Sequence, residues 1–439
     1  MSTPVSRRSF LIGSSTLGLS LVGGSLLAAC GGEDPTAPAA AGEVTWSLWG
    51  DSATLKRHQE LNDRINASQS AVKASFVGLP TDGYAKKITA ELAAGNAPDV
   101  FLVGDTQLGQ LIKDGSLAEL GPLLDGPLSK STTSSFNPKL LAPGTSGDGK
   151  VYGVPAACNP MIMWFNSKVL EEAGVTTSPA DSLTAGSWTA DYFQTVLDKV
   201  KATGKRAFVF SNWNGETYPW LTSRGGKIFD GGQFVAHEDP KTIDTIKWLR
   251  ELLASETIWY ASALPQGQGA DAMFMADQLA FTLTGRWVVP QYRKQSSLRA
   301  DVVPLPSTDG SPSSTIVLAS YLVINKATKN VDNAFRVFTE YLSKDGQSFI
   351  LDGDLGLAVP SITGADSVVL SGNYPAHAQT FLDQRDSGYS SMVEEMRVPG
   401  LSGLIFKPLD KYFTEGGDLA AIMSDMGKQV NAAIQKGSV

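Results

Sequence analysis

The sequence predicts an α/β protein with more than one hydrophobic core, on three observations. Strand and helix patterns alternate from residue 43 onward, which implies parallel strands joined by helical crossovers. About 400 residues follow the leader, which is more than one core usually accommodates. The apolar run 152–166 contains Pro155, Asn159 and Pro160. Proline disfavours one continuous central strand, so we expect two short extended pieces where the chain passes between lobes.

The first 29 residues have the pattern of an export signal. Two arginines precede an uncharged run over 10–29, and a Leu-Ala-Ala-Cys sequence ends at Cys30. The arginines resemble a twin-arginine signal, and the four residues resemble a bacterial lipobox. We expect residues 1–29 to be a signal peptide, Cys30 to carry lipid, and residues 30–42 to form a flexible tether. The alternative is an uncleaved membrane anchor, although glycine, serine and threonine dilute the run.

Charge and composition exclude several classes of function. A net charge of -8 without a basic tract argues against a nucleic-acid partner and against electrostatic binding to anionic lipid. Besides Cys30 the chain has one cysteine, Cys158, in an apolar run, where a buried inert thiol is expected. His58, His237 and His377 are not in a metal-ligand spacing. We expect no metal and no cofactor.

The first elements form a strand and helix series. Val44, Trp46 and Leu48 share one face of a strand over 43–49, so Trp46 is expected in the core. Trp49 lies on the other face at the carboxyl end, where ligands of open α/β sheets bind. The expected elements that follow are a helix at 52–67, a strand at 72–77, a helix at 84–94 and a strand at 100–103.

Later elements are marked by caps and aromatic residues. Thr189 is expected to cap a helix in which Trp188 packs on Phe193. Aromatic and amide residues over 211–220 follow a strand at 207–210, and they form either a sugar platform or a packed loop. The further expected elements are a helix from 240, a strand at 279–283, a helix at 288–294, a strand at 321–324, a helix at 331–342, and a mostly helical last hundred residues with a loop at 398–403.

The sequence contains few candidate catalytic motifs. Residues 144–150 nearly match a phosphate-binding loop, but Val151 replaces the hydroxyl residue that holds magnesium, so a hairpin turn is expected there. Asp51, Asp99 and Asp105 are carboxylates that could form an acid/base pair for glycoside cleavage. A secreted glycosidase or lyase is therefore kept as an alternative of a different class.

Five segments in a fixed order carry a resemblance to a known family: 91–101 (ELAAGNAPDVF), 152–168, 225–230, 275–287 and 334–347. Together they resemble the extracellular solute-binding proteins of ABC importers, specifically the carbohydrate-binding group related to maltose-binding protein. The resemblance covers about residues 43 to 439. The leader agrees with it, because many such proteins are lipoproteins.

The resemblance implies a class II, two-lobe periplasmic-binding-protein-like α/β fold with a hinge and an interlobe cleft. The N-terminal lobe is expected from 43–156 and 303–350, and the C-terminal lobe from 157–302 and 351–439. The resemblance also implies a monomer without enzymatic activity, which captures a sugar or oligosaccharide and delivers it to an ABC transporter permease. The protein would be extracytoplasmic and held at the bacterial cell membrane by lipid on Cys30.

The resemblance also implies a set of ligand-binding residues. Trp287 matches the tryptophan that packs on the sugar, and Phe406 matches a second stacking aromatic. Arg286 departs from the proline or small residue usual in the family, and with Arg224 it supports an alternative ligand, a charged solute such as a sugar acid or sugar phosphate. The full set is Trp49, Asp105, Asn159, Trp213, Arg286, Trp287 and Phe406.

Overall fold

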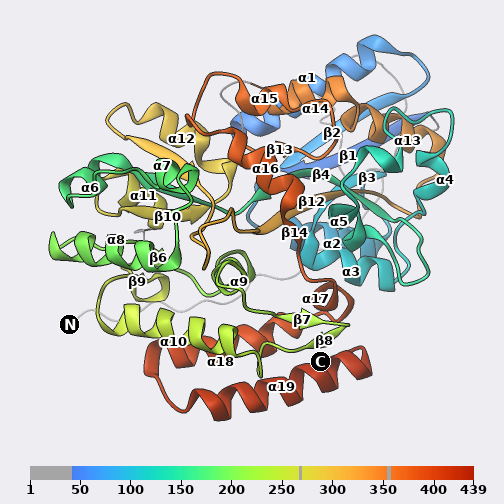
Figure 1. Cartoon of the computed structure of the whole chain (residues 1–439). Helices are drawn as coiled ribbons and strands as arrows, with labels where there is room; N and C mark the ends of the chain where they lie inside the picture. The colour runs from blue at the N-terminus through green and yellow to red at the C-terminus, as the bar shows by residue number, and fades with distance from the viewer. Residues whose placement is uncertain (1–41, 266–268, 353–356) are drawn as a thin grey trace, which may run out of the picture. The chain divides into compact units, whose positions relative to one another are not determined.

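The protein is described by a computed structural model, in which residues 42–265, 269–352 and 357–439 are placed. The predicted signal peptide, Cys30 and nearly all of the predicted tether lie outside the described residues. The described chain contains two main sheets with helices packed against them (Figure 1).

The first sheet has seven strands, in the order β13-β4-β12-β3-β1-β2, with β14 beside β12. Strand β1 pairs in parallel with both β2 and β3, as the alternating pattern predicted, whereas β12 is antiparallel to β3 and β4. The strands are β1 (Glu43–Trp49), β2 (Lys73–Leu79), β3 (Val100–Gly104), β4 (Gly153–Pro160), β12 (Ile316–Ile324), β13 (Val359–Pro360) and β14 (Tyr389–Ser390).

The start of this sheet follows directly from its sequence pattern. Trp46 is 1% exposed, and its indole Nε1 donates to Asn62 Oδ1 on the first helix at 2.9 Å. That helix begins after Asp51, whose carboxylate accepts from the Thr54 backbone N–H, because an N-cap side chain satisfies an otherwise free amide. The helices that accompany this sheet are α1 (Ser52–Ser68), α2 (Tyr84–Ala94), α3 (Asp105–Lys113), α4 (Gly121–Leu124), α5 (Pro138–Leu141), α13 (Val331–Tyr341) and α14 (Lys344–Leu351).

Strand β4 shows how a proline is accommodated in this sheet. The apolar run forms two strands, as predicted, but the first continues through Pro155. The register shifts there, so that Ser320 pairs with Ala157 and Tyr321 with Pro155. Strand β13 pairs only with residues 157 and 158. Pro155 therefore has a strand partner on one side only, where its missing N–H breaks no ladder.

The second sheet has three antiparallel strands in the order β10-β5-β11. Its centre, β5 (Ile162–Asn166), runs on into a helix that Asn166 caps through its side chain. Its neighbours are β10 (Phe281–Thr284) and β11 (Ala300–Val303). Two separate two-stranded sheets pair β6 (Val209–Phe210) with β9 (Trp259–Tyr260) and β7 (Phe229–Asp230) with β8 (Gln233–Phe234).

Helices supply most of the remaining chain. Helix α18 packs on α19 and on α10, and these three lie side by side in Figure 1. The predicted Thr189 cap is present, with Trp188 and Phe193 ring centroids 5.5 Å apart. The helices are α6 (Ser167–Glu172), α7 (Pro179–Thr184), α8 (Ala190–Ala202), α9 (Asn214–Ser223), α10 (Pro240–Ala254), α11 (Ala270–Met275), α12 (Val289–Lys294), α15 (Ser367–Leu370), α16 (Gln379–Ser387), α17 (Val393–Arg397), α18 (Leu401–Glu415) and α19 (Leu419–Lys436).

Three further comparisons with the sequence predictions are informative. Residues 214–223 form helix α9 although Pro219 lies inside it, so the aromatic segment is not a loop. Residues 144–150 do form the predicted turn, which Ser146 N–H closes on the Lys150 carbonyl. Strands β13 and β14 add residues beyond 351 to the first sheet, whereas the predicted lobe boundaries, which remain a prediction, assign 351–439 to the C-terminal lobe.

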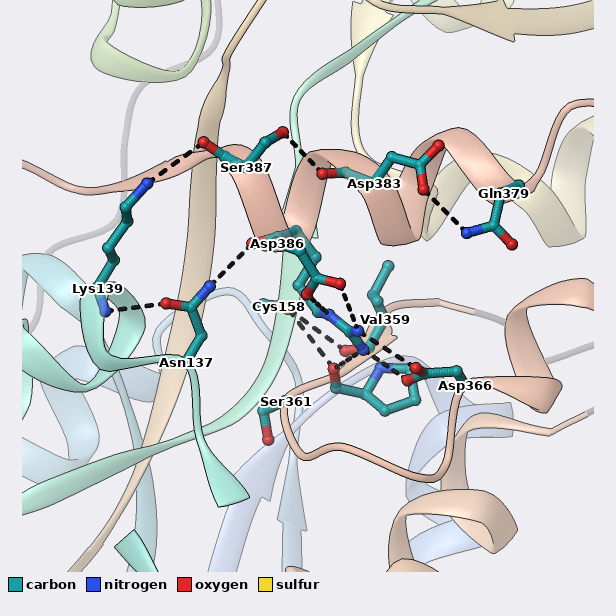
Figure 2. A network of polar contacts seen from close by, with 12 residues as sticks. Asn137, Lys139, Cys158, Val359, Ser361, Asp366, Gln379, Asp383, Asp386 and Ser387 are labelled. Atoms are coloured by element: carbon teal, nitrogen blue, oxygen red, sulfur yellow. Dashed lines mark hydrogen bonds and ion pairs between the residues drawn. The ribbon is translucent and has the colours of Figure 1, made fainter. Parts of the chain in front are cut away.

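Cys158 lies buried beside an arginine network (Figure 2). Its Sγ is 3.6 Å from the Val359 carbonyl oxygen, and burial raises the pKa of the thiol to about 12. The Arg385 guanidinium contacts Asp366 at 2.6 Å and Asp386 at 2.8 Å. A thiol that is buried and protonated in this way is a packing group rather than a nucleophile.

Candidate functional site

A cavity of about 740 Å³ lies where the carboxyl ends of β1 and β3, the middle of β4 and β12, and the starts of α9 and α12 come together. Its volume is in the range of small-molecule sites, about 300–1,000 Å³. The described residues that line it include Trp49, Asp51, Thr54, His58, Asp105, Asn159, Trp213, Asn214, Trp287, Gln291, Ser320 and Tyr341.

Trp287 lines the cavity from the short 3-10 helix at Arg286–Val288, directly after β10. A methyl group at Gly285 would lie only 2.2 Å from Trp287 Cζ3, so the indole packs directly against the backbone of the preceding turn. The ring is half-buried, which leaves part of it available to the cavity. Strand β10 thus ends by presenting an aromatic surface where the sequence predicted one.

Trp213 has a similar arrangement before α9. Its side chain is 36% exposed, and a methyl group at Gly215 would lie 2.3 Å from its Cη2 atom. The indole Nε1 donates to Glu216 Oε1 at 3.3 Å, while Glu216 Oε2 accepts from the Ser211 backbone N–H at 2.8 Å. Burial raises the pKa of Glu216 to about 8. These contacts fix the indole at the cavity wall.

The first sheet contributes three more of the predicted residues. Trp49 packs edge-on against Tyr84, with ring centroids 5.1 Å apart. Asp105 is the first residue of α3, and its carboxylate accepts from the Ser391 hydroxyl. Asn159 Oδ1 accepts from the Arg286 backbone N–H at 2.9 Å, so this carboxamide joins β4 to the turn that carries Trp287.

Two predicted residues are not among the described residues that line the cavity. Arg286 is 2% exposed, and its guanidinium donates to the carbonyl oxygens of Ala358, Val368 and Val369 at 3.1–3.4 Å. Burial lowers the pKa of Arg286 to about 10. Phe406 lies in α18 and packs on Tyr218, with ring centroids 5.3 Å apart. The structure therefore brings five of the seven predicted residues together.

Sequence reasoning missed the contribution of α1 and α13. Asp51, Thr54 and His58, which come after Trp49, are separated from one another by three and four residues, which places them on one face of a helix. That spacing was the available signal. Tyr341, from the end of α13, lies against His58 with ring centroids 5.8 Å apart.

The electrostatics of the lining are mildly acidic. No lysine or arginine lines the cavity within the described ranges, whereas Asp51 and Asp105 do. The Thr54 backbone N–H lowers the pKa of Asp51, whereas a general acid needs a raised pKa. Asp99 accepts from Thr45 and Thr328 instead and is absent from the lining. The cavity offers hydrogen-bonding carboxylates and amides beside aromatic faces.

The described residues also bear on metal sites and on membrane-spanning segments. In that part of the chain, no group of three or more histidine, cysteine, aspartate or glutamate side chains is arranged to hold a metal ion. No helix placed by the structure is long and apolar enough to cross a membrane.

The chain is similar to known binding proteins in sequence and in fold. The maltodextrin-binding protein MdxE of Bacillus subtilis is 25% identical over 335 residues, which are 74% of this chain and 72% of MdxE. A maltooligosaccharide ABC transporter solute-binding lipoprotein of Streptococcus pneumoniae serotype 4 is 24% identical over 359 residues, 78% of this chain and 79% of the relative. An ABC substrate-binding protein of Listeria monocytogenes, solved with cycloalternan, superposes with a TM-score of 0.74 at 18% identity, over 90% of this chain and 99% of that one.

These likenesses agree with the two-lobe α/β fold of periplasmic binding proteins. A family model described as bacterial extracellular solute-binding protein matches residues 58–348, well over half of the chain. This chain therefore belongs to the bacterial extracellular solute-binding protein family.

Proposed function

We propose that the protein captures a neutral sugar or oligosaccharide in the cavity and delivers it to the permease of an ABC transporter. The observation that carries the proposal is the arrangement of Trp49, Trp213 and Trp287 around one cavity that also contains carboxylate and amide groups. The C–H faces of a sugar ring pack on aromatic rings, and its hydroxyls need fixed polar partners. The names of the maltodextrin- and maltooligosaccharide-binding relatives support the same ligand class.

A neutral ligand is favoured over a sugar acid or sugar phosphate by the charges at the cavity. Arg286, the predicted partner of an anion, is buried and donates to backbone carbonyls. Arg224 lies 4.4 Å from the Trp248 ring centroid and is not a lining residue. Asp51 and Asp105, which do line the cavity, would repel an anion.

The protein acts without catalysis and at the outer side of the membrane. The lowered pKa of Asp51 does not suit a general acid. The Asp99 carboxylate accepts a hydrogen bond from the Thr45 backbone N–H instead of lining the cavity. Both observations argue against glycoside cleavage. Export by the twin-arginine-like leader and lipid on Cys30 would hold the binding protein, as a monomer, near its permease. The pneumococcal relative is likewise named a lipoprotein.

A ligand screen tests this proposal. The melting temperature of the purified protein would be measured with a panel of neutral mono- and oligosaccharides, sugar acids and sugar phosphates, and hits titrated by calorimetry. A sugar at one hundred times its Kd should stabilise the fold by about 2.7 kcal/mol. Binding of anions alone would contradict the neutral-sugar proposal, and turnover of a glycan would contradict the binding-protein proposal.

A further inference from the structure

One end of the cavity contains polar atoms without partners among the described residues. His58 Nε2 and Thr54 Oγ1 are both buried, and neither forms a hydrogen bond of normal geometry with a described group. The Asp51 carboxylate lies beside the Thr54 hydroxyl. Both residues line the cavity from one face of α1, four positions apart. A buried polar atom left unpaired is costly, so two such atoms in one cavity wall suggest that a ligand completes them.

The chemistry of His58 defines what the ligand must supply. Its Nδ1 lies 2.7 Å from the Thr54 carbonyl oxygen, which can only accept, so Nδ1 carries the hydrogen. Burial lowers the pKa of His58 to about 4, and the ring is therefore neutral at physiological pH. Nε2 is then an acceptor, and it requires an O–H or N–H donor. The Thr54 hydroxyl can donate to a neighbouring oxygen of the same group.

Besides the Asp51 carboxylate, which accepts from the Thr54 backbone N–H at 2.8 Å, aromatic and aliphatic side chains contribute to the cavity wall. The His58 ring stacks on Tyr341 with an interplanar angle of 15°. The aliphatic side chains that line the same cavity include Leu48, Ile350 and Leu351, each no more than 6% exposed. A sugar hydroxyl that packs against these aliphatic side chains would have no hydrogen-bond partner there. A group with one donor beside methyl or methine carbons matches this wall better.

We propose that Thr54, His58 and Tyr341, with Leu48, Ile350 and Leu351, form a subsite that selects a ligand unit carrying a hydrogen-bond donor on an otherwise apolar group. We name it the His58 subsite. Two carbohydrate modifications have this chemistry: the acetamido group, with its N–H and methyl, and the deoxysugar, with a hydroxyl beside a methyl. The inference rests on the proposed sugar-binding function and deepens it, because it names the substituted class of sugar.

Matched ligand pairs test the selection. Cellobiose and diacetylchitobiose differ in their acetamido groups, and galactose and D-fucose differ in one hydroxyl. By calorimetry, at least one substituted sugar should bind about tenfold or more tightly than its hydroxylated counterpart. Tighter binding of diacetylchitobiose than of cellobiose identifies an acetamido group as the selected unit. Tighter binding of D-fucose than of galactose identifies a deoxysugar. If sugars bind without either preference, the subsite is wrong and the proposed function stands; if no sugar binds, both fail.

Variants separate a binding role from a structural one. Thr54→Val and His58→Phe preserve shape and remove the two unpartnered atoms, and each should reduce the affinity for the preferred sugar about tenfold. Ser47→Ala is the matched control, because Ser47 Oγ is also buried and unpartnered but is not a lining residue. It should leave the affinity unchanged. A merely structural His58 would shift the melting temperature of His58→Phe without changing the ratio of affinities within a pair.

A spectroscopic readout tests the hydrogen bond itself. The chain has three histidines, so the ring nitrogens of a 15N-histidine sample give few signals, and the His58→Phe spectrum identifies those of His58. Addition of the preferred sugar should shift the unprotonated Nε2 resonance as it accepts a hydrogen bond. A Nε2 signal that does not move at saturating sugar would overturn the assignment.

Discussion

Gly285 and Trp287 are in direct contact across the turn that follows β10: a methyl group on the glycine would lie 2.2 Å from Cζ3 of the indole. Gly215 and Trp213 repeat the relationship before α9, at 2.3 Å from Cη2. In both cases the glycine is two residues from a tryptophan that lines the cavity. The absence of a side chain at each glycine therefore sets the position of an aromatic surface.

Gly285→Ala should reduce sugar affinity without unfolding the protein. The backbone at residue 285 is extended, with φ −80°, so alanine is compatible with it, and the effect comes from displacement of the Trp287 ring. Loss of an aromatic anchor can cost about 2 kcal/mol, roughly thirtyfold in affinity, and partial displacement should cost part of this. The measurement is calorimetric titration beside a thermal melt.

A glycine-to-alanine control accompanies that variant. Gly121→Ala places its methyl group in open space and is not at the cavity. It should bind sugar with wild-type affinity. Equal affinities for the Gly285→Ala and Gly121→Ala proteins would contradict the role of the glycine contact.

The sequence was informative wherever the deciding interactions are local. Caps at Asp51 and Thr189 depend on neighbours within three residues, and these two helix starts were predicted. Trp287 was named from the family resemblance, and it lies between the strand and the helix expected at 279–283 and 288–294. Helix α9 was missed because Pro219 and its dense aromatic residues hide a helical period.

Positions decided by distant contacts could not be predicted. Arg286 looked available to a ligand, yet its guanidinium meets carbonyl oxygens of Ala358 and Val368, more than seventy residues further along the chain. The continuation of β4 through Pro155 depends on which neighbours β12 and β13 supply there. His58 was considered only as a metal ligand, and its place in the cavity depends on the packing of Tyr341.

Trp287→Ala should reduce affinity far more than it reduces stability. The indole is half-buried and lines the cavity, so its removal should lower affinity about thirtyfold. Trp188→Ala is the comparison, because that fully buried ring should cost about 3–5 kcal/mol of stability. Calorimetry and denaturant melts of both variants separate the two effects. Wild-type affinity in a strongly destabilised Trp287→Ala protein would show that the ring belongs to the core.

Cys30→Ser should release the protein from the membrane fraction of a bacterial host. The prediction rests on the lipobox-like residues before Cys30 and on the polar, proline-containing stretch after it. Without a thiol there is no acceptor for lipid, and the buried acyl chains that would anchor the protein are lost. Fractionation followed by immunoblotting measures the result. A variant that stays with the membrane would indicate an uncleaved anchor.

His58 should make the stability of the protein fall as the pH decreases below neutrality. Burial lowers its pKa from 6.5 to about 4. Between these values the unfolded chain takes up a proton on this ring and the folded protein does not, so the free energy of unfolding decreases as the pH falls through this window. The full effect is about 3 kcal/mol, and it is complete once the pH is below about 4.

The difference between wild type and His58→Phe isolates this contribution. Other groups with shifted pKa values, such as Glu216 and Glu395, are present in both proteins, so their titration cancels to first order in the difference. Urea unfolding at several pH values between 7 and 4 gives the free energy for each protein. Relative to wild type, the variant should become more stable as the pH falls, by up to about 3 kcal/mol. Parallel pH profiles for the two proteins would mean that His58 titrates normally in the folded state, and therefore that its ring is open to water rather than enclosed between α1 and Tyr341.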